Sequence, residues 1–98
     1  MQTVIELLTF KVSSDEMTQW IKVEEEVWTA FLKQQPGFMR KELWYSETEP
    51  DLVKAVIWWQ SIEQWRTITK EQCDAVDKRM GKWLRSCTMQ TWQVIKEY

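Results

Sequence analysis

Residues 52–60 read LVKAVIWWQ, and this stretch decides the fold. Side chains alternate between the two faces of a strand, and here both sets are largely apolar. They are Val53, Ala55, Ile57 and Trp59 on one face, and Val56 and Trp58 on the other. A strand that is apolar on both sides belongs to a sheet whose two faces are both covered by protein.

The preceding segment forms the other half of a hairpin. Residues 38–47 also alternate, with Phe38 and Trp44 on one face and Met39, Leu43 and Tyr45 on the other. The turn residues Glu49-Pro50-Asp51 separate the two runs. We therefore expect an antiparallel hairpin.

Further upstream, residues 4–12 form another strand with two apolar faces. Ser14-Asp15-Glu16 then supplies a helix start with acidic residues in the first turn, and apolar residues recur at helical spacing to about Gln34. Pro36 and Gly37 end this helix, because proline cannot continue it and glycine accepts the left-handed turn that follows.

Downstream, residues 61–64 (SIEQ) and residues 69–72 (TKEQ) both resemble capping boxes, so the second helical region should break near Thr69. Residues 87–95 return to alternation and end the chain as a strand. The order βαββαβ is that of a ferredoxin-like α+β fold, with one four-stranded antiparallel sheet and both helices on one face. We expect residues 1–98 to form a single domain.

Two helices cover only one face of such a sheet. The uncovered apolar face would exceed what soluble monomers normally expose. We therefore expect two copies of the chain to pair through their sheets, as a homodimer of the dimeric α/β-barrel type. The alternative is a monomer whose Trp rings lie flat at the sheet edges.

The composition narrows the possible functions. Lys and Arg number 13 against 15 Asp and Glu, a net charge of −2, which argues against nucleic acid or an anionic membrane as partner. The first residues, MQTVIE, have neither the basic nor the apolar character of a signal peptide, so we expect a cytoplasmic protein.

The chain contains no His, which excludes Ser-His-Asp and Cys-His catalysis and most zinc and haem sites. We expect neither a metal nor a cofactor. Cys73 and Cys87 could form a disulfide, but we favour packing as small hydrophobic side chains in a cytoplasmic protein.

Two stretches carry a family resemblance: Gln35-Pro36-Gly37-Phe38 and residues 56–65, VIWWQSIEQW. With the strands around them, they resemble the antibiotic biosynthesis monooxygenase-like domains of the dimeric α/β-barrel superfamily. Within these, the chain is most similar to a small uncharacterised cyanobacterial group. The resemblance implies a sheet-paired dimer, but it spans quinone-forming monooxygenases, haem-degrading enzymes, isomerases and domains without known activity.

Residue-by-residue transfer argues against haem degradation. The Asn, Trp and His of haem-degrading relatives correspond here to Leu7, Ile68 and Lys78. Cofactor-independent monooxygenases of the superfamily use Asn, Trp and Tyr, and this chain has no Asn. Only the Trp and Tyr components carry over.

Two residues are candidates for acid–base chemistry. Glu24 falls on the apolar stripe of the first helix, where burial would favour its neutral form and suit a general acid or base. The competing interpretation, which we favour, is an ion pair with Lys or Arg, or a side chain that reaches solvent. Tyr45 could donate a proton to an oxygenated substrate, although a strand Tyr usually packs its ring and keeps its hydroxyl in water. Glu6 should pair with Arg40 or Lys54 on neighbouring strands.

The eight Trp residues suggest an aromatic interior. Their rings either line a pocket in which a flat ligand stacks or simply fill the core. The pocket candidates are Trp20, Glu24, Trp28, Trp44, Trp58 and Trp65, together with Trp83. The leading hypothesis is a protein that binds a flat, apolar or aromatic small molecule and oxidises it without a prosthetic group. The rival is a non-catalytic homodimeric ligand-binding or interaction module.

Overall fold

The computed structural model describes residues 2–98 and contains one four-stranded antiparallel sheet. Its strands are β1 (Val4–Lys11), β2 (Phe38–Tyr45), β3 (Leu52–Trp59) and β4 (Cys87–Gln93). Their spatial order is β2-β3-β1-β4, so the two most apolar strands are central and β2 and β4 form the edges. This is the α+β, ferredoxin-like arrangement that the sequence predicts.

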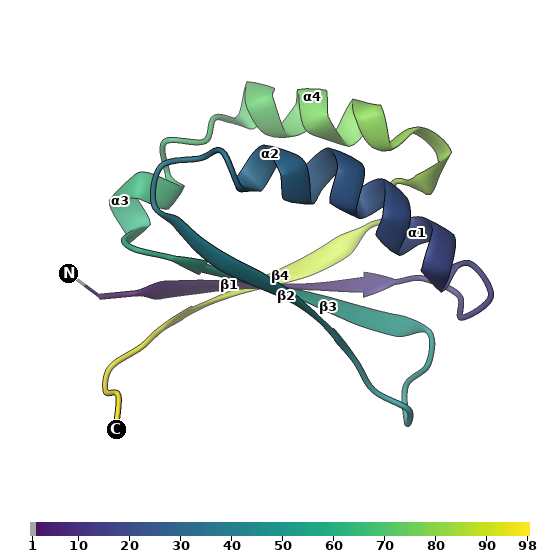
Figure 1. Ribbon diagram of the computed structural model, residues 1–98, viewed down its shortest axis with the longest axis horizontal. Coiled ribbons are helices and arrows are strands. Elements are labelled where there is room, and N and C mark those ends of the chain that lie inside the picture. Colours follow the sequence, from purple (N-terminus) through teal and green to yellow (C-terminus); the bar gives the residue numbers. More distant parts are fainter. Residues whose placement is uncertain (1) are drawn as a thin grey trace.

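The helices all lie on one side of the sheet (Figure 1). The first helical region runs through α1 (Met17–Glu24), a π-helical turn (Glu25–Thr29) and α2 (Ala30–Leu32). It therefore ends two residues before the expected Gln34 and carries a π-helical turn that the apolar spacing does not reveal. The second region contains α3 (Ile62–Trp65) and α4 (Lys70–Met80).

The break between α3 and α4 occurs where the sequence predicts it. Thr69 caps α4 by accepting a hydrogen bond from the backbone N–H of Gln72, and the Gln72 side chain accepts one from the backbone N–H of Thr69. Ser61 caps α3 in a related way, through the backbone N–H of Gln64. The polar caps satisfy backbone groups that would otherwise lack partners at the start of each helix.

The register decides which strand residues face the helices. In β1 these are Val4, Glu6, Leu8 and Phe10, and across the sheet Glu6 and Lys41 both stand opposite Ile57. A row of three helix-facing side chains therefore runs from β1 to β2 through the middle of the sheet.

The expected faces of β2 were partly wrong. The register shifts between Phe38 and Arg40, so Phe38 faces the helices together with Leu43, while Trp44 points to the other side. A β-bulge adds one residue to a strand and so changes which later residues share a face. The bulge cannot be seen in a pattern of simple alternation.

The face turned away from the helices, called the open face below, is rich in apolar side chains. They are Ile5, Leu7, Val56, Trp58, Trp44 and Trp92. Trp44 and Trp92 are 44% and 55% exposed, whereas the guanidinium of Arg40 lies 4.0 Å from the centre of the Trp58 ring.

Within residues 2–98, no helix has the length and apolar character needed to cross a membrane.

Candidate functional site

A cavity of about 820 Å³ lies between the helices and the sheet. Its walls are mostly apolar, and they include the small side chain of Ala55 on the central strand β3. Its large lining side chains include Leu8, Phe10 and Ile57 from the sheet and Trp28, Trp65 and Met80 from the helices. This volume falls within the usual range for small-molecule sites.

The main polar feature of the cavity wall is a buried ion pair. The Lys41 ammonium group on β2 binds the carboxylate of Glu24 on α1, and both side chains are about 5% exposed or less. Lys41 Nζ also donates to Thr29 Oγ1 at 2.7 Å, and Thr29 Oγ1 donates to Glu24 Oε2 at 2.9 Å. Each charge therefore has more than one polar partner, as a buried ion pair requires.

The π-helical turn explains how Thr29 reaches Glu24. In a π-helix the hydrogen bonds join residues five apart, so side chains at positions i and i+5 lie on the same face. Glu24 and Thr29 have this separation, and in a regular α-helix Thr29 would be turned away from Glu24 by more than a quarter turn. The turn thus builds part of the site.

A second carboxyl group, that of Glu6, lies on the same face of the sheet as Lys41, with β3 between their two strands. Trp59 Nε1 donates to Glu6 Oε1 at 3.2 Å. Burial raises the pKa of Glu6, while the hydrogen bond from Trp59 and the charge of Lys41 oppose this rise. Burial also lowers the pKa of Lys41 to about 8, against the opposing effect of the Glu6 charge.

The partners expected for Glu6 were wrong. Arg40 and Lys54 both belong to the open face, where Arg40 stacks on Trp58 and Lys54 Nζ donates to Thr9 Oγ1 at 2.9 Å. Glu6 faces the helices, so neither cation reaches it. Lys41 lies on the same face as Glu6, and its charge acts on that carboxyl group.

The structure brings four of the expected pocket residues together: Trp20, Glu24, Trp28 and Trp65 line the cavity. Trp28 Nε1 donates to Asp77 Oδ1 on α4 at 2.9 Å, which ties the two helical regions together. Trp20 is completely buried.

Other expected residues lie elsewhere. Trp44 and Trp58 belong to the open face. Tyr45 is 56% exposed and borders a smaller pocket of about 260 Å³, which Trp44 also lines. Trp83 packs beside the apolar cluster of Val12, Trp20 and Met80 rather than in the cavity wall.

The sequence reasoning missed Lys41 and Thr29. A signal for Lys41 existed, because it alternates in step with Leu43 on the helix-facing side of β2. The π-helical turn that aligns Thr29 with Glu24 left no such signal.

Both thiols border the same cavity and are free, and burial raises the pKa of Cys73 and of Cys87. Within residues 2–98, no three Cys, Asp or Glu side chains are grouped so that they could hold a metal ion.

The fold has counterparts among solved structures. The chain shares its ferredoxin-like architecture with antibiotic biosynthesis monooxygenase-type proteins. One is SnoaB from Streptomyces nogalater, a cofactor-independent oxygenase: the TM-score is 0.74 at 15% identity, over 99% of this chain and 97% of that one.

Another is an inferred antibiotic biosynthesis monooxygenase from Caulobacter crescentus, with a TM-score of 0.75 at 16% identity, over 97% of this chain and 92% of that one. A conserved protein from Methanosarcina mazei has a TM-score of 0.71 at 8% identity, over 94% and 92% of the two chains. No protein-family model and no curated protein matches the sequence.

Proposed function

We propose that this chain forms one ferredoxin-like domain, residues 1–98, that binds a flat, apolar small molecule between its helices and its sheet. The observation that carries the proposal is the cavity of about 820 Å³, with its aromatic and aliphatic walls. Apolar cavities with a few placed polar groups are the usual design of small-ligand sites. Trp28 and Trp65 line the cavity, and aromatic rings can stack with a flat molecule.

The proposed chemistry is oxidation by O₂ without a prosthetic group, as in the cofactor-independent oxygenase SnoaB, which has the same fold. In the reaction that we propose for this chain, a ring CH₂ and O₂ become a ring C=O and water, so the substrate supplies the electrons. Of the two candidate catalytic residues, we favour Glu24 over Tyr45, because Glu24 borders the cavity while Tyr45 borders the smaller pocket. The carboxylate of Glu24 can remove a proton from the substrate when its ion pair with Lys41 is broken.

Ligand binding is tested by thermal shift with a panel of two- and three-ring aromatic compounds. Compounds that bind the folded state raise the melting temperature with increasing concentration. The variant Ala55→Phe should abolish the shifts, because Ala55 is buried at the cavity floor and the larger ring fills the space. Lys78→Phe, on the exposed side of α4, serves as the control and should keep them. No shift with any compound would contradict the proposal.

Oxidation is tested separately, by O₂ uptake with anthrone-like and quinol substrates. Uptake above the uncatalysed rate that Ala55→Phe abolishes is expected. Absence of uptake with compounds that do bind would contradict the oxygenase part alone.

A specific observation favours the second candidate function, a binding module without catalysis. Both carboxylate oxygens of Glu24 already have hydrogen-bond partners in Thr29 and Lys41. The carboxylate is therefore occupied in holding the structure together and is not free to accept a proton from a ligand. If the protein is such a binding module, the aromatic compounds give thermal shifts, but O₂ uptake does not exceed the uncatalysed rate.

We further propose that two copies pair through their open faces and that the protein acts in the cytoplasm, with its nearest relatives in the small cyanobacterial group. The exposed rings of Trp44 and Trp92 support a covered face, since monomers rarely expose large apolar patches. Size-exclusion chromatography with light scattering should give twice the mass of the chain. A monomer at micromolar concentration would contradict the pairing.

A further inference from the structure

The indole N–H of Trp20 differs from those of Trp28 and Trp59, which have hydrogen-bond partners. Trp28 Nε1 donates to Asp77, and Trp59 Nε1 donates to Glu6. Trp20 is 0% exposed, and among the side chains that the structure describes its Nε1 is buried without a hydrogen-bond partner. Buried polar groups are nearly always paired, so an unpaired donor on a residue that lines a cavity indicates a place for an acceptor.

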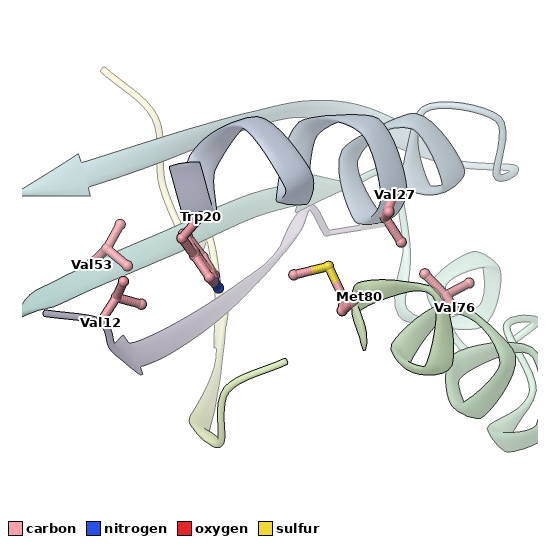
Figure 2. Close-up of a cluster of buried hydrophobic side chains, with 6 residues drawn as sticks. All are labelled: Val12, Trp20, Val27, Val53, Val76 and Met80. Carbon is pink, nitrogen blue, oxygen red and sulfur yellow. The ribbon is translucent and has the colours of Figure 1, made fainter. Parts of the chain in front are cut away.

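The position of Trp20 places this donor at one end of the cavity. Its ring packs on Phe10, with 5.1 Å between the ring centres, and Figure 2 shows the nitrogen at the end of the ring farthest from α1. Phe10 and Glu6 are four residues apart on β1, which corresponds to about 13 Å. The cavity thus has the Trp20 donor towards one end and the carboxyl group of Glu6 towards the other.

The wall around the Trp20 nitrogen can adapt to a ligand. Met80 lies beside Trp20 in the same apolar cluster (Figure 2). Met80 also lines the cavity. Methionine has three rotatable bonds and fills irregular gaps, so its side chain can give way to an incoming atom.

The surroundings of Trp20 select the kind of acceptor. The cavity wall as a whole carries charges of both signs, such as Glu6 and Arg85, but Trp20 itself packs in an apolar cluster with Val12 and Met80. Burying an unpaired anion among apolar side chains is costly, whereas an uncharged carbonyl oxygen that receives the hydrogen bond is tolerated. An indole N–H only donates, so it requires an acceptor such as this oxygen.

Resting on the proposed function, we infer that Trp20 is a specificity residue of the cavity, whose Nε1–H binds the carbonyl oxygen of a flat, uncharged ketone. The aromatic rings hold the apolar body of the ligand. Trp20 selects the orientation in which the edge that carries the oxygen faces its N–H.

The test compares two flat compounds with the same three-ring skeleton, 9-fluorenone and fluorene. Only 9-fluorenone has a carbonyl group. The wild-type protein should bind 9-fluorenone more tightly than fluorene by about three- to tenfold, the value of one hydrogen bond. Trp20→Phe keeps an aromatic ring but no donor, and it should remove this preference. Trp28→Phe is the matched control: it also alters the wall, but its N–H is already bound to Asp77, so the preference should remain.

A second measurement does not depend on the folding of a core variant. In wild-type protein labelled with ¹⁵N at the indole nitrogens, the Trp20 Nε1–H resonance, assigned through the backbone, should move downfield with 9-fluorenone and not with fluorene. Equal binding of the two compounds, with no selective shift of this resonance, would overturn the role of Trp20 and leave the proposed function standing. If neither compound nor any other of the aromatic panel binds, the proposed function fails and this inference fails with it.

Discussion

The carboxylate of Glu24 and the ammonium group of Lys41 join helix α1 to the edge strand β2 inside the protein, with 4% and 5% of the two side chains exposed. Removing one partner leaves an uncompensated buried charge. We expect Lys41→Met to lower the free energy of unfolding by about 3–5 kcal/mol.

The double variant Glu24→Leu, Lys41→Met removes both charges and should be close to wild type, since apolar replacement of a whole buried pair is often neutral. Urea unfolding of the three proteins measures the difference. A single variant that costs less than about 1 kcal/mol would contradict a closely coupled pair.

The pKa of Lys41, about 8 in the folded protein against an ordinary value of 10.5, predicts a pH dependence. Between these values the unfolded chain holds the Lys41 proton and the folded chain releases it. Stability therefore rises with pH from about 8 to 10.5, by up to about 3 kcal/mol. The difference in unfolding free energy between wild type and the double variant, measured across this window, isolates the effect. If this difference does not change with pH, the pKa of Lys41 is not lowered in the folded protein.

Glu6 should give the stability of the protein the opposite dependence on pH. Its pKa is raised from 4.5, so above pH 4.5 the folded protein holds this proton more tightly than the unfolded chain does. The wild type consequently loses stability as pH rises through the raised pKa.

The variant Glu6→Gln carries no such proton and can still accept the hydrogen bond from Trp59. It should be more stable than wild type at pH 7, with an advantage that disappears below pH 4.5. Melting temperatures at pH 4 and pH 7 check this, and the exposed Glu63→Gln is the control.

Position 37 requires glycine for two reasons: its backbone conformation and the closeness of Gln64. Its φ is +83°, and a Cβ there would lie 2.6 Å from the Cβ of Gln64. We expect Gly37→Ala to destabilise by more than the ~1–3 kcal/mol of backbone strain alone. Gly81→Ala is a matched control, because Gly81 has φ +57° but no atom within 4 Å of an added Cβ. Equal losses of melting temperature would show that the contact with Gln64 is unimportant.

The open face can be tested at its centre. Leu7 stands between Val56 and Gln90 on that face, so Leu7→Arg places a charge where the proposed partner copy would pack. We expect a monomer by light scattering at concentrations where the wild type is a dimer. Ala75→Arg, on the exposed side of α4, should keep the dimer.

Much of the fold could be predicted because its signals are local. The alternation in residues 52–60, the caps at Ser61 and Thr69, and the Pro36-Gly37 stop each depend on neighbouring residues. The two-sided apolar pattern of β1 and β3 also correctly indicated that the helices leave one face open.

The site was harder to predict because it depends on two irregularities. The bulge after Phe38 moves Trp44 to the open face, and the π-helical turn brings Thr29 to Glu24. The packing of α1 over β2 then brings Lys41 to the same carboxylate, a contact between residues 17 positions apart. Glu24 was recognised as unusual, but its partner depends on the assembled tertiary structure.

The π-helical turn also affects how the chain tolerates changes in length. Such a turn holds one residue more than the α-helix on either side of it. Loss of a single residue there, such as the exposed Glu26, would restore a regular α-helix and leave Trp20 and Leu32 facing the core. A deletion elsewhere in the helix would rotate one part against the other by about 100°. The Glu24–Lys41–Thr29 site can therefore be lost in a single deletion while the architecture around it survives.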